Sequence, residues 1–167
     1  MKHTLAVLVL NKPGVLARIS GLISRRVFNI ESIAASSTEE PDITRITIVV
    51  QGDDQILDQV VKQLSKLVDV IKIQELPWGK ESIERELALI KVKALTNSRS
   101  EIVDIVNIFR ANIVDVNRET MVIEMTGDEQ KINALCTVLE EHGIVEIVRT
   151  GIIAMSRKPN PIKYSEE

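Results

Sequence analysis

The spacing of apolar residues changes along this chain in an order that occurs twice. Continuous or alternating apolar residues, typical of strands, give way to a spacing of three and four, typical of amphipathic helices. The first series gives strand, helix, strand, strand, helix and strand at residues 4–10, 15–23, 29–37, 45–50, 56–64 and 68–73. The second gives the same order at residues 87–94, 102–109, 113–116, 120–125, 128–139 and 144–155. The sequence therefore predicts an α+β protein with two ferredoxin-like βαββαβ units in tandem.

The domain boundaries are predicted where this pattern stops. Residues 77–84 contain Pro-Trp-Gly followed by charged residues, which is typical of a linker. The first domain is then expected over residues 1–76 and the second over residues 85–157. The last ten residues, 158–167, contain two prolines and several charges and are expected to form a flexible tail.

The first strand predicts an additional contact surface. In a ferredoxin-like unit both helices cover the same face of the sheet. Every residue from Leu5 to Leu10 is apolar, so both faces of this strand are apolar. We expect a second copy of the chain or another partner protein to cover the face that carries no helix.

The composition disfavours several classes of partner. Acidic and basic residues are mixed and give a net charge of −3, whereas a general nucleic-acid binder shows a basic excess. The four aromatic residues are scattered, so they do not indicate a surface for base stacking. No apolar run approaches the roughly 18 residues that span a bilayer. We therefore expect no nucleic-acid partner, no membrane partner and a cytoplasmic location.

The side chains that most often carry catalysis are few and dispersed. His3 and His142 belong to no metal-spaced or nucleophile–base pattern. His142 is interpreted as a basic residue at a helix end. Cys136, the single cysteine, is interpreted as a buried structural thiol. The acidic turn at residues 39–42 is interpreted as solvated, and no glycine-rich phosphate-binding motif is present. We expect no catalytic residue and no metal site on this chain.

The loop at residues 11–18, between the first strand and the first helix, has the clearest binding chemistry. A helix N-terminus leaves backbone N–H groups without partners, and its dipole favours an anion. A glycine here has no side chain to keep a ligand carboxylate from these donors. Two asparagine amides can bind the charged groups of an amino acid, and three aliphatic residues can bound a small apolar pocket. The predicted site consists of Asn11, Gly14, Val15, Leu16, Asn29 and Ile30.

Taken alone, Asn-Lys-Pro-Gly is also an ordinary turn at the start of a helix. The stretch Asn-Lys-Pro-Gly-Val-Leu-Ala-Arg, followed by Phe-Asn-Ile-Glu-Ser-Ile, resembles an ACT domain. More narrowly, the chain resembles the small regulatory subunit of acetolactate synthase, also called acetohydroxyacid synthase, over residues 2–157. Further matching stretches follow in the family's order at residues 44–47, 62–70, 84–92, 109–110, 113–116 and 146–151.

The resemblance implies a regulatory role without catalysis. In this family the small subunit binds a catalytic large subunit, raises its activity and confers feedback inhibition by valine or related end products. The large subunit condenses pyruvate with pyruvate or 2-oxobutyrate in branched-chain amino acid (isoleucine, valine and leucine) biosynthesis. It carries thiamine diphosphate, magnesium and FAD, so we expect no cofactor on this chain.

The resemblance also implies that the effector site is shared. ACT domains of the family pair as a homodimer and bind valine at their interface. One copy would then supply Asn11, Gly14, Val15 and Leu16, and the other would supply Asn29 and Ile30. Ala17 departs from the family, in which serine is common at this position, so the identity and affinity of the effector stay open.

Two other functions compete with this interpretation. A small acylphosphatase-type enzyme would use the loop at residues 11–18 to hold phosphate, and it would need an arginine within that loop. Here the loop offers Lys12, while Arg18 lies a turn into the helix. An amino-acid-responsive transcription regulator would need a DNA-binding element, and the two units leave no residues for one.

Overall fold

The chain folds into two compact units. The computed structural model describes residues 1–24, 29–77, 79, 81–159 and 162. The first unit comprises residues 1–83 and the segment that begins at Ile152, and the second comprises residues 84–151. Of the predicted features, Phe28 in the ACT-like stretch, Trp78 in the linker and residues 160–161 and 163–167 of the tail lie outside the described residues.

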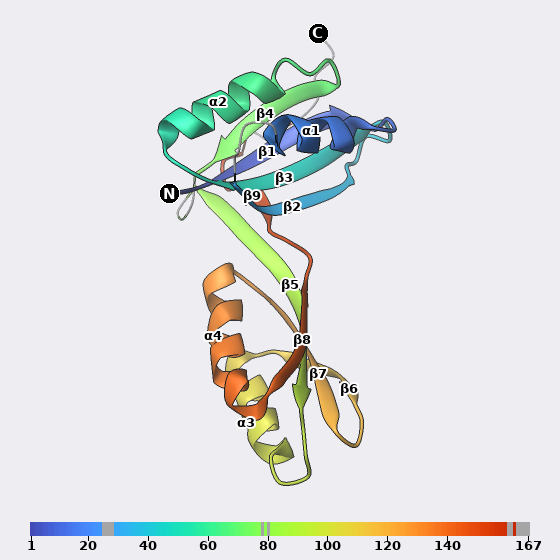
Figure 1. The fold of residues 1–167 in the computed structure, drawn as a ribbon, viewed down its shortest axis with the longest axis vertical. Coiled ribbons are helices and arrows are strands. Elements are labelled where there is room, and N and C mark those ends of the chain that lie inside the picture. The colour runs from blue at the N-terminus through green and yellow to red at the C-terminus, as the bar shows by residue number, and fades with distance from the viewer. Residues whose placement is uncertain (25–28, 78, 80, 160–161, 163–167) are drawn as a thin grey trace. The chain divides into compact units, whose positions relative to one another are not determined.

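The first unit has the predicted βαββαβ order. Its elements are β1 (Lys2–Leu10), α1 (Val15–Ser24), β2 (Asn29–Ser37), β3 (Ile43–Gln51), α2 (Asp54–Leu64) and β4 (Val70–Leu76). The strands form an antiparallel sheet in the order β2-β3-β1-β4, and both helices lie on the same side of it (Figure 1).

The core of this unit lies between the sheet and the two helices. Alternate residues of β1 and β3 point to the helices, because successive strand side chains point to opposite faces. They meet residues spaced three and four apart on the helices, which form one apolar stripe. The core includes Leu5, Val7, Val9, Ile19, Ile23, Ile46, Ile48, Val50, Val60 and Leu64.

The other face of this sheet is covered by the chain's own C-terminal segment. Within this segment β9 (Ile153–Ser156) places Ala154 in a small buried cluster with Ala6 and Leu76. Arg45 Nη2 donates a hydrogen bond of 2.6 Å to the carbonyl oxygen of Ala154. Our expectation that a second copy or another protein covers this face is therefore wrong for the part that the segment occupies.

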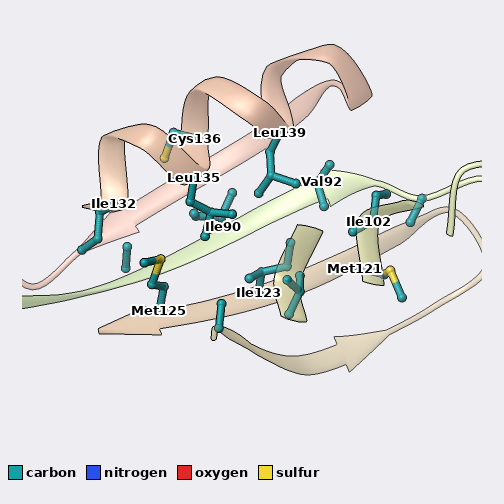
Figure 2. Packing of buried hydrophobic residues seen from close by; sticks show 14 residues of the cluster. Ile90, Val92, Ile102, Met121, Ile123, Met125, Ile132, Leu135, Cys136 and Leu139 are labelled. Atoms are coloured by element: carbon teal, nitrogen blue, oxygen red, sulfur yellow. The ribbon is translucent and has the colours of Figure 1, made fainter. Parts of the chain in front are cut away.

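The second unit repeats the element order. It contains β5 (Ser82–Lys93), α3 (Arg99–Phe109), β6 (Asn112–Val116), β7 (Thr120–Gly127), α4 (Glu129–Leu139), a 3₁₀ turn (Glu140–His142) and β8 (Ile144–Arg149). The strand order is β6-β7-β5-β8, and β9 also pairs with β5. Figure 2 shows side chains of α4 packed against β5 and β7, including Leu135, Ile90 and Ile123. The predicted α+β fold of two tandem ferredoxin-like units is confirmed.

Two details of the predicted domain layout differ from the structure. The predicted linker at residues 77–84 is partly strand, because β5 begins at Ser82. The predicted closing strand at residues 144–155 is two strands, β8 and β9, and the second belongs to the first unit. Gly151 lies between them with φ of 83°, a left-handed conformation that interrupts the strand and that glycine adopts readily.

Aspartates cap two of the described helices. Asp53 accepts a hydrogen bond from the Ile56 N–H at the start of α2, and Asp128 accepts one from the Lys131 N–H at the start of α4. Ser98 and Glu101 have the spacing of a capping box, but the Ser98 side chain does not cap α3. The Ser98 hydroxyl donates instead to the carbonyl oxygen of Leu95 behind it.

The described helices are all short. None of them is long and apolar enough to cross a membrane.

Candidate functional site

The loop between β1 and α1 forms an open helix N-terminus. The Arg18 N–H donates to the Gly14 carbonyl oxygen at 3.0 Å, so Gly14 accepts the first helical hydrogen bond of α1. The Val15 N–H donates to the Lys12 carbonyl oxygen at 3.4 Å. The N–H groups of Leu16 and Ala17 have no acceptor within the helix. Together with the helix dipole they provide a place for an anion such as a carboxylate.

Gly14 meets two requirements at this position. Its φ is 84°, which side-chain-bearing residues rarely adopt. An added Cβ would meet no heavy atom within 4 Å, so the space beside the helix N-terminus is open. The loop itself is fixed, because the Asn11 N–H donates to the carbonyl oxygen of Asp42 at 2.8 Å. The site is therefore accessible and its backbone is held in place before any ligand binds.

The two aliphatic residues of the loop have different surroundings. Val15 is 4% exposed and packs in the core of the first unit, whereas Leu16 is 47% exposed. Only Leu16 therefore presents a side chain to a ligand at the surface. The Val15 side chain anchors the first turn of α1, and its backbone N–H donates to the Lys12 carbonyl oxygen.

The remaining predicted residues lie at the opposite end of the same sheet. Asn29 pairs with Gln51, which pairs with Lys2 at the start of β1, and the Asn29 amide lies 3.4 Å from the Gln51 side-chain oxygen. The loop instead follows Leu10 at the end of β1. The length of β1 between these ends is about 26 Å at the usual rise per strand residue. A single chain therefore does not bring Asn29 and Ile30 to Gly14.

Arg18 is already engaged in the structure. Its Nη2 lies 2.9 Å from Oδ2 of Asp69, a carboxylate that is only 14% exposed. An acylphosphatase-type site would need this guanidinium to face a phosphate. The ion pair therefore disfavours that competing interpretation.

The other reactive side chains are in structural positions. His3 Nδ1 lies 3.1 Å from Glu75 Oε1, and the ring is almost fully buried. Cys136 is a buried free thiol, as predicted. The residues of the turn at 39–42 are exposed. Among the described residues, no three His, Cys, Asp or Glu side chains are grouped so that they could hold a metal ion.

A cavity that the sequence did not predict lies on the helix-free side of the first sheet. Its volume is about 340 Å³, and its walls include Leu8, Arg45, Leu76 and Met155. Burial lowers the pKa of the Arg45 guanidinium, while the nearby Glu39 carboxylate acts in the opposite direction. None of the six predicted site residues lines this cavity. The prediction missed it because residues 155–156, 158–159 and 162 form part of its wall and were assigned to the second domain and the tail.

The chain is similar to known proteins over both units. Residues 5–72 match the AHAS small subunit-like ACT domain, and residues 85–158 match the family described as the small subunit of acetolactate synthase. A probable acetolactate synthase small subunit of Archaeoglobus fulgidus is 55% identical over 157 residues, which are 94% of this chain and 98% of that protein. The acetolactate synthase small subunit of Mycolicibacterium smegmatis is 52% identical over 160 residues, covering 96% of this chain and 94% of the relative.

A solved structure agrees with the fold as well as the sequence. The crystal structure of the acetolactate synthase small subunit from Thermotoga maritima matches with a TM-score of 0.89 and 42% identity. The match covers 96% of this chain and 99% of that one, so it includes both units.

Proposed function

Because this chain belongs to the family of acetolactate synthase small subunits, we propose that it activates the catalytic large subunit and confers feedback inhibition by valine. The family resemblance inferred from the sequence motifs is confirmed, and the chain is a non-catalytic regulatory subunit. The proposal assigns thiamine diphosphate, magnesium and FAD to the large subunit and no cofactor to this chain. It places this chain and the large subunit in the cytoplasm, where they act in branched-chain amino acid biosynthesis.

The observation that supports an amino-acid effector is the open N-terminus of α1. A Cβ added to Gly14 would meet no heavy atom within 4 Å outside its chain neighbours, so the position beside this helix N-terminus is open. The N–H groups of Leu16 and Ala17 suit the carboxylate of an amino acid, and the exposed Leu16 side chain offers an apolar contact for a branched side chain. The Asn11 amide, also exposed, can take part in binding the ammonium group.

Strand order supports a site that is completed by a second copy. β2 is an edge strand, so its outer backbone groups can pair with another strand. In a symmetric pair the two β2 strands would run antiparallel. The second copy's Asn29 and Ile30 would then lie at the end of the sheet where the first copy carries Gly14. In this arrangement Asn29 and Ile30 of one copy lie near Gly14 of the other, although β1 keeps them about 26 Å apart within one chain.

The proposed inhibition requires only a modest coupling energy. An allosteric coupling of about 1–3 kcal/mol changes the partner's equilibrium 5- to 150-fold. Valine must bind the activating and non-activating arrangements of the pair with different affinity, or it shifts nothing. A site formed by two chains can supply this difference, because rotation of one chain against the other changes the distance between Gly14 and the second copy's Asn29.

The experiment combines calorimetry with reconstitution. Valine, leucine, isoleucine and alanine are titrated into the isolated chain, and the chain is then added to its large subunit with and without valine. We expect saturable binding of a branched-chain amino acid, higher activity on addition of the chain, and inhibition by the same ligand. A folded chain that binds none of these amino acids refutes the effector assignment. A large subunit whose activity the chain does not change refutes the regulatory assignment.

A further inference from the structure

The segment that leaves the second unit is fixed to β2 at its first residue. The second unit ends at Gly151, and the next residue, Ile152, is 7% exposed in the first unit. The Ile152 N–H donates to the hydroxyl oxygen of Ser32 at 2.9 Å. Ser32 is therefore the point on β2 to which the chain attaches as it returns from the second unit.

Ser32 lies directly after an irregularity in β2. Ile30 pairs with Val50 and Ser32 pairs with Val49, so Glu31 is one extra residue in this strand. Such a bulge breaks the regular ladder locally and changes the direction of the side chains beside it. Glu31 is held by Lys2, whose Nζ lies 2.7 Å from its carboxylate.

The bulge separates Ser32 from the two β2 residues of the proposed effector site. Asn29 and Ile30 precede it, and Ser32 follows it on the face that the C-terminal segment covers. A ligand that fixes the start of β2 therefore acts on the bulge and, through it, on the direction of the Ser32 hydroxyl. The half-buried Ile152 N–H loses its acceptor if that hydroxyl turns away, and an unsatisfied buried donor is costly.

We propose that Ser32 is a positioning residue that transmits effector binding at the start of β2 to the segment joining the two units. This inference rests on the proposed function, because it needs an effector at Asn29 and Ile30. A second anchor, the hydrogen bond from Arg45 on β3 to the carbonyl oxygen of Ala154, holds β9. The hydrogen bond to Ile152 fixes the backbone directly after Gly151, whose φ is 83°.

The test separates binding from coupling in the reconstituted enzyme. Three variants are compared: Ser32→Ala removes the acceptor, Ser32→Thr keeps a hydroxyl in a strand-compatible residue, and Ser36→Ala is a matched control. Ser36 lies on the same strand and is exposed. Valine affinity is measured by calorimetry, valine inhibition by enzyme assay, and exchange of the Ile152 amide by hydrogen–deuterium exchange.

We expect Ser32→Ala to bind valine within about 2-fold of the wild-type affinity in the isolated chain while its inhibition weakens by about 2- to 30-fold. Its Ile152 amide exchanges about 2- to 10-fold faster and no longer responds to valine. Ser32→Thr restores both responses, and Ser36→Ala behaves as wild type.

Inhibition of Ser32→Ala equal to wild type, with valine bound, overturns the inference and leaves the proposed function intact. An Ile152 amide in the wild type that does not respond to bound valine also overturns it. A wild-type chain that does not bind valine refutes the effector assignment and this inference together. Circular dichroism checks that each variant is folded.

Discussion

Replacing Gly14 with aspartate tests the proposed carboxylate site most directly. Gly14 lies at the N-terminus of α1, and the space where its Cβ would point is empty to at least 4 Å. Gly14→Asp puts a carboxylate into the space that the effector's carboxylate is proposed to occupy. Gly14→Asn adds a side chain of nearly the same shape without the charge, and both residues are among those that best tolerate the positive φ. The difference in valine affinity between these two variants therefore measures the repulsion between the two carboxylates.

The expected magnitude follows from the distance between the two carboxylates. At 4 Å, two unit charges repel by about 1 kcal/mol in bulk water and by about 4 kcal/mol at the effective dielectric constant of a protein surface. The loop is exposed, so the value lies between these limits. Relative to Gly14→Asn, the dissociation constant for valine should rise by about 5-fold to about 1,000-fold in Gly14→Asp.

Calorimetry with valine at low and high salt checks this value. The difference between the two variants should shrink as salt rises, because screening weakens interactions between exposed charges. Gly14→Ala controls for backbone strain, and all variants are compared by thermal unfolding. Equal valine affinity of Gly14→Asp and Gly14→Asn at low salt would show that no carboxylate binds at this helix N-terminus.

Two further predictions concern the fold and use matched pairs of variants. Asp53→Ala should lower the free energy of unfolding by about 1 kcal/mol, because α2 loses its N-cap. Ser98→Ala should lower it less, because Ser98 donates to the Leu95 carbonyl oxygen and does not cap α3. Equal losses of unfolding free energy in urea would contradict this assignment. Gly52→Ala should destabilise the fold by about 1–3 kcal/mol, because the added Cβ would lie 2.7 Å from Cγ2 of Ile56. Gly21→Ala should stabilise α1 by about 0.5–1 kcal/mol, because its added Cβ would meet no heavy atom within 4 Å. Thermal unfolding measures both glycine variants, and a melting temperature of Gly52→Ala at or above that of the wild type would refute the clash with Ile56.

Local sequence determined the elements and their order. The apolar run in β1, the alternation in β3 and the three-and-four spacing in α1 and α2 are local patterns, so each could be interpreted without the tertiary structure. Asp53 was predictable for the same reason, because a cap acts within one turn of its own helix. Ser98 shows the limit of such signals, because this residue type often caps helices but here its hydroxyl donates to the Leu95 carbonyl oxygen.

The candidate site was predictable only in part. The role of Gly14 was predictable, because the opening at the helix N-terminus depends only on the residues of this loop. Whether Val15 or Leu16 faces solvent depends on how α1 lies on the sheet, and this placed Val15 in the core.

Two successive βαββαβ units and a glycine at the start of the first helix follow from the sequence, because they depend on interactions within a few residues. The return of the chain after Gly151 to cover the first sheet, and the position of Asn29 at the far end of that sheet from Gly14, become visible in the three-dimensional structure. Both depend on pairings between residues far apart in the chain, such as Ser32 with Ile152, and no local pattern records such a pairing.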